Sequence, residues 1–231
     1  AAALVGGPLL LTPSANVPTQ VRAEIERLEP RTIYILGGTG AVSQSVESTL
    51  RGIAPVERLG GTTRYDTGLA IVNAIFSSST TAFIATGRTF PDALAAAGAA
   101  GAKDAPVILV DGMGNTVPSS TLATLQRLGV QSVAIAGASG AVSNGIANQL
   151  SSAGYAVSRF GGADRYETAA LINNAFFSSA STNTMFLATG KDFPDGLAGG
   201  AVAGRLGAPL YVTDPTCVPA SVRTSIIALA P

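Results

Sequence analysis

Two segments of the chain carry an arginine, a tyrosine and a carboxylate in the same order: residues 64–67 (RYDT) and residues 165–168 (RYET). An arginine guanidinium can hold a carboxylate or a phosphate through two parallel hydrogen bonds. Arg64 and Arg165 could therefore clamp an anionic ligand, or each could pair with a carboxylate of the chain itself. We favour the internal pairing, because ordered ion pairs are common where loops meet helices.

A second repeated segment also carries a carboxylate, at residues 88–92 (RTFPD) and 191–195 (KDFPD). Proline followed by an acidic residue is typical of a helix start, where the carboxylate interacts favourably with the helix dipole. We expect Asp92 and Asp195 to be the internal partners of the two arginines. A catalytic role is disfavoured because the same residues recur along one chain, and repetition suits a multivalent binding array better than an active site.

Glycine-rich loops follow two predicted strands, at residues 37–40 (GGTG) and 137–140 (GASG). Such loops bind phosphates when their backbone N–H groups point at the ligand. Neither loop has the Lys-Ser/Thr pair of a P-loop, and no ribose-binding acid of a dinucleotide site can be recognised. We therefore interpret them as tight turns that require positive φ. The glycines concerned are Gly37, Gly38, Gly40, Gly137 and Gly140.

The elements that must position these residues alternate between strands and helices. Short apolar runs that end at glycine predict buried strands, and amphipathic or alanine-rich runs predict helices. The expected helices are 65–76, 91–103, 118–128 and 142–150, and the expected strands are 81–86, 106–110, 132–136 and 156–160. Asp66 or Thr67 is expected to cap the first helix and Ser143 the last. The alternation predicts an α/β fold, with a parallel sheet covered by helices on both faces.

A further apolar segment begins with proline in three places, at residues 8–11 (PLLL), 106–109 (PVIL) and 209–212 (PLYV). Its length and composition predict a strand of the core. Where the end of such a strand reaches a surface edge, it could contact a partner or a polymer.

The motifs return after about 100 residues, so the chain is a tandem repeat. This period is too long for one turn of a solenoid, and each unit is large enough to form a small domain. We expect a partial repeat at 1–57, a complete repeat at 58–158 and a second partial repeat at 159–231. The chain would then be a fragment of a longer protein.

Composition excludes several classes of function. Charged residues make up only 12% of the 231 residues, and 14 Lys and Arg balance 14 Asp and Glu, so we expect no nucleic-acid partner. The absence of histidine removes the commonest general base and zinc ligand, and we expect no metal site and no cofactor. The single cysteine, Cys217, cannot form an intramolecular disulfide, and no apolar stretch is long enough to span a membrane.

Taken in order, the motifs at 58–67 (RLGGTTRYDT), 85–94 (ATGRTFPDAL), 105–109 (APVIL) and 137–143 (GASGAVS) resemble the cell-wall-binding repeat 2 family. The resemblance covers essentially the whole chain. It implies three tandem repeats, each with a Toprim-like fold, in a pseudo-threefold arrangement. It also implies a bacterial surface protein held non-covalently on an anionic, teichoic-acid-like wall polymer, with the proline-led segment at the binding site. Residues 211–212 depart from the pattern of that segment, so the third copy is left out of the candidate binding residues.

From this resemblance and from the placement of charge, we expect a non-enzymatic extracellular module that anchors a surface or secreted protein to the cell wall through several weak contacts. The candidate polymer-binding residues are Arg64, Arg88, Arg165, Lys191, Pro8, Leu9, Leu10, Leu11, Pro106, Val107, Ile108 and Leu109.

Two alternatives stay open. The repeats could form a self-assembling surface layer or filament, in which partial units of neighbouring chains complete each other. An overlap of about thirty residues between these partial units counts against it. The other alternative is an enzyme that acts on sugar phosphates through the glycine-rich loop, which the lack of histidine and the repeated site disfavour.

Overall fold

A computed structural model describes residues 1–229, apart from the side chain of Ser181. The chain divides into two compact units, a smaller one at Leu10–Ala74 and a larger one that contains Ala1–Leu9 and the chain from Ile75 onward. These units do not follow the expected repeat boundaries at 58 and 159, which stay a prediction because a compact unit can combine parts of two repeats.

The smaller unit is built on two parallel strands, with Ile33 opposite Val56 and Leu36 opposite Leu59. Its core brings together Ile25, Ile35, Val46 and Leu50. Helices therefore cover this short sheet by the same kind of apolar contact that the sequence pattern predicts. In chain order its elements are α2 (Thr19–Leu28), β1 (Ile33–Leu36), α3 (Gln44–Arg51), β2 (Val56–Leu59) and α4 (Arg64–Ile75), whose last residue already belongs to the larger unit.

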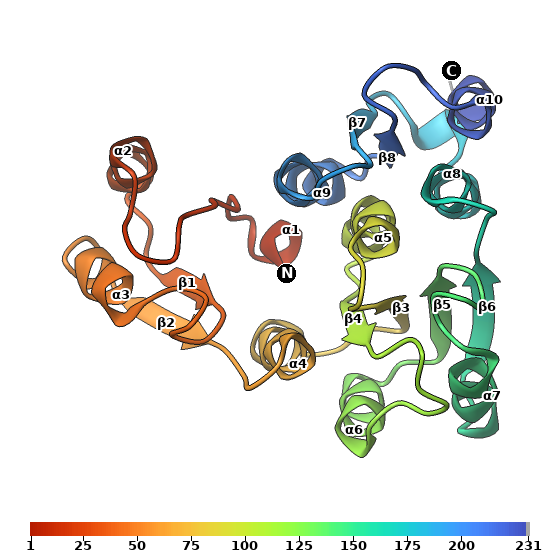
Figure 1. Cartoon of the computed structure of the whole chain (residues 1–231), viewed down its shortest axis with the longest axis horizontal. Helices are drawn as coiled ribbons and strands as arrows, with labels where there is room; N and C mark the ends of the chain where they lie inside the picture. Colours follow the sequence, from red (N-terminus) through yellow and green to blue (C-terminus); the bar gives the residue numbers. More distant parts are fainter. Residues whose placement is uncertain (230–231) are drawn as a thin grey trace. The chain divides into compact units, whose positions relative to one another are not determined.

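The larger unit holds a four-stranded parallel sheet in the order β4-β3-β5-β6. In Figure 1, α5 and α8 lie on one face of this sheet and α6 and α7 on the other. The predicted parallel sheet with helices on both faces is therefore confirmed. The elements are β3 (Thr81–Thr86), α5 (Pro91–Ala102), β4 (Val107–Val110), α6 (Ser119–Leu128), β5 (Ser132–Ala136), α7 (Asn144–Ser152), β6 (Ala156–Phe160) and α8 (Arg165–Phe176).

A second, two-stranded parallel sheet in the larger unit repeats the first half of the four-stranded one. Its strands pair Phe186 with Leu210 and Thr189 with Thr213. α9 lies beside α5 (Figure 1), and α10 packs on α8. The elements are α1 (Ala2–Val5), a 3₁₀ turn (Ser179–Ser181), β7 (Phe186–Thr189), α9 (Pro194–Leu206), β8 (Leu210–Thr213) and α10 (Ala220–Leu229).

Helix ends follow from local hydrogen bonding. The Ser143 hydroxyl accepts the N–H of Ile146, so α7 starts one residue after its predicted cap. Gly129 ends α6 with φ of 71°. The expected cap of α4 by Asp66 or Thr67 is wrong, because the hydroxyl of Thr63 accepts the Asp66 N–H at 3.2 Å and the Asp66 carboxylate accepts the Thr63 N–H in return.

Residues 8–11 form no strand, so the expectation of a core strand is wrong for this segment. The expectation of a strand is confirmed for the other two proline-led segments, which overlap β4 and β8, the strands that pair with β3 and β7. A strand is stable only with hydrogen-bonded neighbours. Within residues 1–229, residues 8–11 pair with no strand, unlike the other two copies.

Small residues let α5, α9 and α1 approach closely. A β-carbon added to Gly204 would lie 2.9 Å from Gly101 Cα and 3.2 Å from Ala3 Cβ. These three residues occupy equivalent positions ahead of the three proline-led segments. A meeting of equivalent positions agrees with the expected pseudo-threefold arrangement, although that symmetry and the Toprim-like name stay predictions.

Candidate functional site

The carboxyl ends of parallel strands form one edge of each sheet, where ligands of open α/β sheets bind. In the larger unit four charged residues lie directly at these ends. Arg88 follows β3, Asp111 follows β4, Lys191 follows β7 and Asp214 follows β8. We call these four residues the charged rim.

The charged rim consists of two ion pairs at equivalent positions of two repeats. Arg88 Nε lies 2.5 Å from Asp111 Oδ1, and its Nη2 lies 3.0 Å from Oδ2. Lys191 Nζ lies 3.2 Å from Asp214 Oδ2. The side chains of Arg88 and Lys191 are 56% and 62% exposed. The cations expected to bind polymer are thus accessible, and each already has an anionic neighbour.

Hydrogen bonds hold the pKa of Asp214 at about 2, below its ordinary value. The backbone N–H of Thr216 contributes most, followed by the Thr216 hydroxyl and Lys191. Thr216 reaches Oδ1 with its N–H at 3.1 Å and with its hydroxyl at 2.8 Å. The carboxylate therefore stays ionised in all but strongly acidic solution.

Asp214→Asn is expected to flatten the loss of stability in acid. Because the folded-state pKa is depressed, the carboxylate stabilises the fold above its ordinary pKa of 3.8, and this contribution is lost as the pH falls toward about 2. Denaturant unfolding between pH 2 and pH 7 measures the effect. Thr216→Ala removes only the hydroxyl donor. Its loss of stability in acid is expected to lie between that of wild type and that of Asp214→Asn. Parallel curves for wild type and Asp214→Asn would contradict the prediction.

The two arginines of the RYDT and RYET segments lie in different units. Arg165 donates from Nη1 to the Gly190 carbonyl at 2.5 Å and so braces the turn before Lys191. Burial raises the pKa of Asp92, and nearby Arg165 offsets part of this rise. The expected partner is therefore close, but the hydrogen bond of Arg165 goes to a carbonyl. The other two members of the expected pairs, Arg64 in α4 and Asp195 in α9, are exposed.

The remaining residues of these segments stabilise the start of a helix. Thr67 Oγ1 accepts the Gly61 N–H at 3.0 Å, and Thr168 Oγ1 accepts the Gly162 N–H at 3.1 Å. The Glu167 carboxylate accepts the Ala163 N–H at 2.7 Å. These contacts favour the structural interpretation of the segments over a ligand clamp.

Only the first glycine of each glycine-rich loop has positive φ, 121° at Gly37 and 111° at Gly137. The glycines Gly38, Gly40 and Gly140 have no such conformation. A β-carbon at Gly40 or Gly140 would meet nothing within 4 Å. Only Gly37 and Gly137 therefore support the interpretation of these loops as turns that require positive φ.

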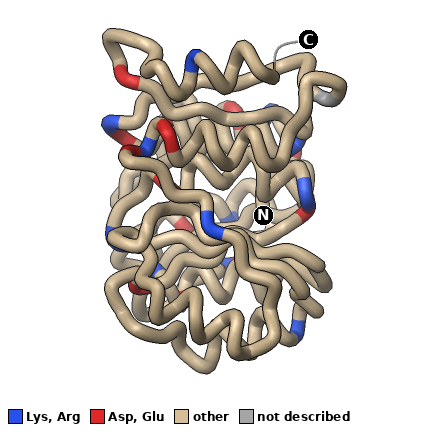
Figure 2. Tube along the Cα trace, turned by 90° about the vertical axis from the view of Figure 1, so that its right-hand side faces the viewer, with Lys and Arg blue, Asp and Glu red and all other residues tan. Residues whose placement is uncertain are grey.

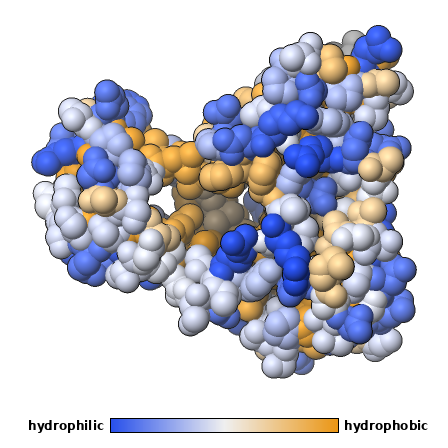
Figure 3. All heavy atoms as spheres, viewed as in Figure 1, coloured by the Kyte–Doolittle hydropathy of each residue, from blue (hydrophilic) through white to orange (hydrophobic). Residues whose placement is uncertain are grey.

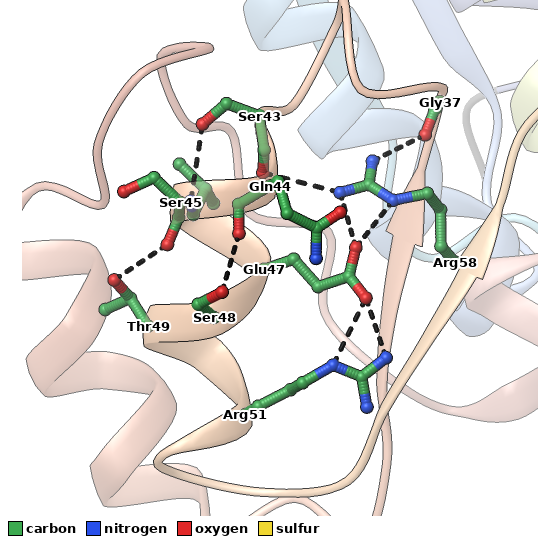
Figure 4. A network of polar contacts seen from close by, with 10 residues as sticks. Gly37, Ser43, Gln44, Ser45, Glu47, Ser48, Thr49, Arg51 and Arg58 are labelled. Atoms are coloured by element: carbon green, nitrogen blue, oxygen red, sulfur yellow. Dashed lines mark hydrogen bonds and ion pairs between the residues drawn. The ribbon is translucent and has the colours of Figure 1, made fainter.

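An arginine on the neighbouring strand holds each loop by its carbonyl groups. Arg58 Nη1 donates to Gly37 O at 2.8 Å, and Arg159 Nη1 donates to Gly137 O at 3.0 Å. In the smaller unit Glu47 joins this contact (Figure 4), receiving hydrogen bonds from Arg51 and Arg58 that lower its pKa. In the larger unit an alanine stands at the equivalent position, and burial lowers the pKa of Arg159. The loops are therefore bound by the protein's own arginines.

The proline-led segments differ in exposure. Pro106 and Ile108 are buried, and Val107 and Leu109 are half-buried against the core. Pro8, Leu10 and Leu11 are exposed, and Leu9 is half-buried. Of the segment 106–109, only Val107 and Leu109 can reach a ligand without a change of structure.

The carboxylates of the charged rim and the loop-holding arginines Arg58 and Arg159 are not among the functional residues predicted from the sequence. A signal for the carboxylates was present, since Asp111 and Asp214 each directly follow the second strand of their repeat. Arg58 and Arg159 open the repeated motif, but only the fold shows which carbonyls they reach.

Charge is sparse along the described chain, and in Figure 2 basic and acidic residues lie interspersed. Among residues 1–229, no cluster of three His, Cys, Asp or Glu side chains could hold a metal ion. No helix in that range is long and apolar enough to cross a membrane.

The fold and the charged rim together define a module built from tandem α/β repeats. The chain belongs to the family described as cell wall binding domain 2 (CWB2), whose model matches residues 1–47, 58–147 and 159–229. It is a cell-wall-binding module, which associates it with the bacterial wall or surface.

Solved structures and curated relatives agree with this family. Cwp6 from Clostridium difficile superposes with a TM-score of 0.87 and 30% identity, over 97% of this chain and 36% of that one. Cwp8 from the same organism also has a TM-score of 0.87, with 25% identity over 99% and 40% of the two chains.

Two Bacillus subtilis (strain 168) proteins are similar in sequence. The N-acetylmuramoyl-L-alanine amidase LytC is 28% identical over 208 residues, which cover 90% of this chain and 40% of LytC. The amidase enhancer is 28% identical over 220 residues, covering 95% of this chain and 29% of the enhancer. The chain thus spans less than half the length of both relatives.

Proposed function

We propose that this chain is the non-catalytic part of a secreted or surface protein and holds that protein on the wall by binding an anionic, teichoic-acid-like glycopolymer. The observation that carries the proposal is the charged rim. Exposed ion pairs contribute at most about 1 kcal/mol to folding. Two of them at equivalent strand ends, on the edge where α/β sheets bind ligands, are better explained by recognition than by stability.

Binding at each pair is weak because an anionic group of the polymer must compete with a carboxylate of the protein for the cation. Several weak contacts along one polymer still retain the protein, since the second contact forms at high effective concentration. The cations of the two repeats differ in how they can hold an anionic group. Arg88 can offer paired donors to a phosphate, whereas Lys191 acts as a point charge.

Retention on purified cell walls tests the proposal, with and without chemical removal of the anionic polymer. The double variant Arg88→Gln, Lys191→Gln is expected to bind intact walls about tenfold more weakly, as loss of two contacts of about 0.7 kcal/mol each would give. Arg22→Gln is the matched control, because its ion pair with Glu26 has similar exposure, 53% and 48%. Equal retention on stripped walls would rule out the anionic polymer.

Self-association is the second candidate, as in a surface layer. The observation that favours it is the outer edge of β7, where Leu187 is 48% exposed and β8 is the paired strand on the other side. A light-scattering mass that stays monomeric up to high concentration would count against it.

A further inference from the structure

The two Phe-Pro-Asp segments, which follow the two cations of the charged rim in the chain, bring a pair of aromatic rings together. Phe90 precedes the first residue of α5, and Phe193 precedes that of α9. Their ring centroids lie 6.0 Å apart with an interplanar angle of 61°. Each ring follows a cation of the charged rim, Arg88 or Lys191, by two residues in the chain.

The fold does not require an aromatic residue at these helix starts. Phenylalanine has no acceptor for the N–H groups of the first turn, and neither Phe90 nor Phe193 makes a side-chain cap. Elsewhere in the larger unit, Ser143 caps α7 and Asp164 caps α8. Replacing such a cap typically costs about 1 kcal/mol. Pro118 before α6 also makes no side-chain cap, but an accessible aromatic ring kept at equivalent helix starts of two repeats is expected where function demands it.

Both rings are accessible to a ligand. Phe193 is 45% exposed. Phe90 packs partly against the core, yet it remains half-buried although α9 lies beside it. Leu197, one turn further along α9, is another apolar side chain that is 37% exposed, and apolar residues recur on the surface shown in Figure 3.

The surroundings favour an uncharged ligand with a small apolar face. Arg88 and Lys191 are each balanced by a carboxylate, and the exposed carboxylates of Asp192 and Asp195 flank Phe193, so no excess of positive charge lies beside the rings. A protein partner would need about 800 Å² of contact on each side, which two rings framed by ion pairs do not offer. A sugar ring has apolar C–H groups on one face and hydroxyl groups at its edge, which matches aromatic rings framed by hydrogen-bonding charges.

We propose that Phe90 and Phe193 form a stacking site for one neutral sugar ring of the wall polymer. The C–H face of the sugar lies over Phe193, and its hydroxyl groups face the ion pairs of the charged rim. This inference rests on the proposed function and assigns separate parts of the polymer to separate residues. The ion pairs take its anionic groups and sugar hydroxyl groups, and the aromatic pair takes the apolar face of its sugars.

Titration with the neutral sugar fraction, prepared from purified wall polymer by removing its phosphate, tests the site directly. Binding is followed through the NMR resonances of the phenylalanine rings and by competition for wall retention. Phe193→Ala is expected to weaken sugar binding about tenfold, and Phe193→Tyr to restore it. Ile227→Ala is the control, because Ile227 is an apolar side chain of α10 that is 69% exposed. The loss in Phe193→Ala is expected to persist at high salt, where the effect of the ion-pair variants shrinks.

The possible results separate this inference from the proposed function. If wild type does not bind the neutral sugars, or if Phe193→Ala binds them equally well, the stacking site is wrong whatever the walls retain. Sugar binding that depends on Phe193, together with no retention on intact walls, would support the stacking site and contradict the proposed wall anchoring. Inorganic phosphate is expected to compete equally against wild type and Phe193→Ala, and unequal competition would contradict the separate roles of rings and ion pairs.

Discussion

Gly101→Ala is expected to destabilise the larger unit by about 1–3 kcal/mol, although alanine is intrinsically the better helix former. A β-carbon at this position would overlap Gly204 Cα and lie 3.0 Å from Gly204 C. Both atoms belong to the backbone of α9, so no side chain can rotate away. The two helices would have to separate and open the alanine-rich core beneath them. Denaturant unfolding of the whole chain measures the change.

The same substitution in the partner helix α9 provides the control. Gly199→Ala would bring a β-carbon no nearer than 3.7 Å to Leu210 Cδ1, an ordinary van der Waals contact. It is expected to stabilise the protein by about 0.5–1 kcal/mol through helix propensity. The two variants should therefore differ in sign. If both stabilise the protein, α5 and α9 do not pack as closely as the structure shows.

Gly161→Ala is expected to cost a similar free energy, about 1–3 kcal/mol, and also to weaken wall binding. Its β-carbon would lie 2.5 Å from Ala138 Cα and 2.6 Å from Gly137 C. The collision displaces the glycine-rich loop that Arg159 holds by the Gly137 carbonyl. Asp92 contacts the same loop, since its Oδ2 occupies the space that a β-carbon on Gly137 would need. The displacement therefore reaches the start of α5, close to Phe90 and Arg88.

Gly140→Ala serves as the matched control within the same loop. It has no positive φ, and a β-carbon there meets nothing within 4 Å. Its stability is expected to stay within about 0.5 kcal/mol of wild type. Wall retention should be compared at a temperature at which both variants are folded. A Gly161→Ala variant with the stability and retention of Gly140→Ala would show that the loop is not braced as described.

The residues of the repeated motif have two different roles, which the sequence by itself does not distinguish. Its opening arginine, its glycines, its acidic residue and its threonine all stabilise local structure. The positions at the strand ends are the ones left exposed. There the chemistry also differs between repeats, with Arg88 in one and Lys191 in the other. The proposed recognition therefore depends on the residues next to the motif's structural positions.

The sequence by itself determined the repeat, the α/β class, the parallel sheet and most element boundaries. These follow from local causes, since apolar periodicity, turn-forming glycines and helix-starting prolines act over a few residues. The strands β3, β5 and β6 span the residues predicted for them. The sequence also supplied the family, because several motifs occur in a fixed order.

Only the tertiary structure decided which charges pair and which equivalent residues are buried. Leu94 and Leu197 occupy the same position of the same motif, yet they are 3% and 37% exposed. Gly196 of α9 lies against Leu94, whereas Leu197 faces solvent. The partner of Arg88 likewise follows a different strand, 23 residues away in the chain. Burial and pairing depend on which neighbour packs against a residue, and no pattern within a few residues of the chain carries that information.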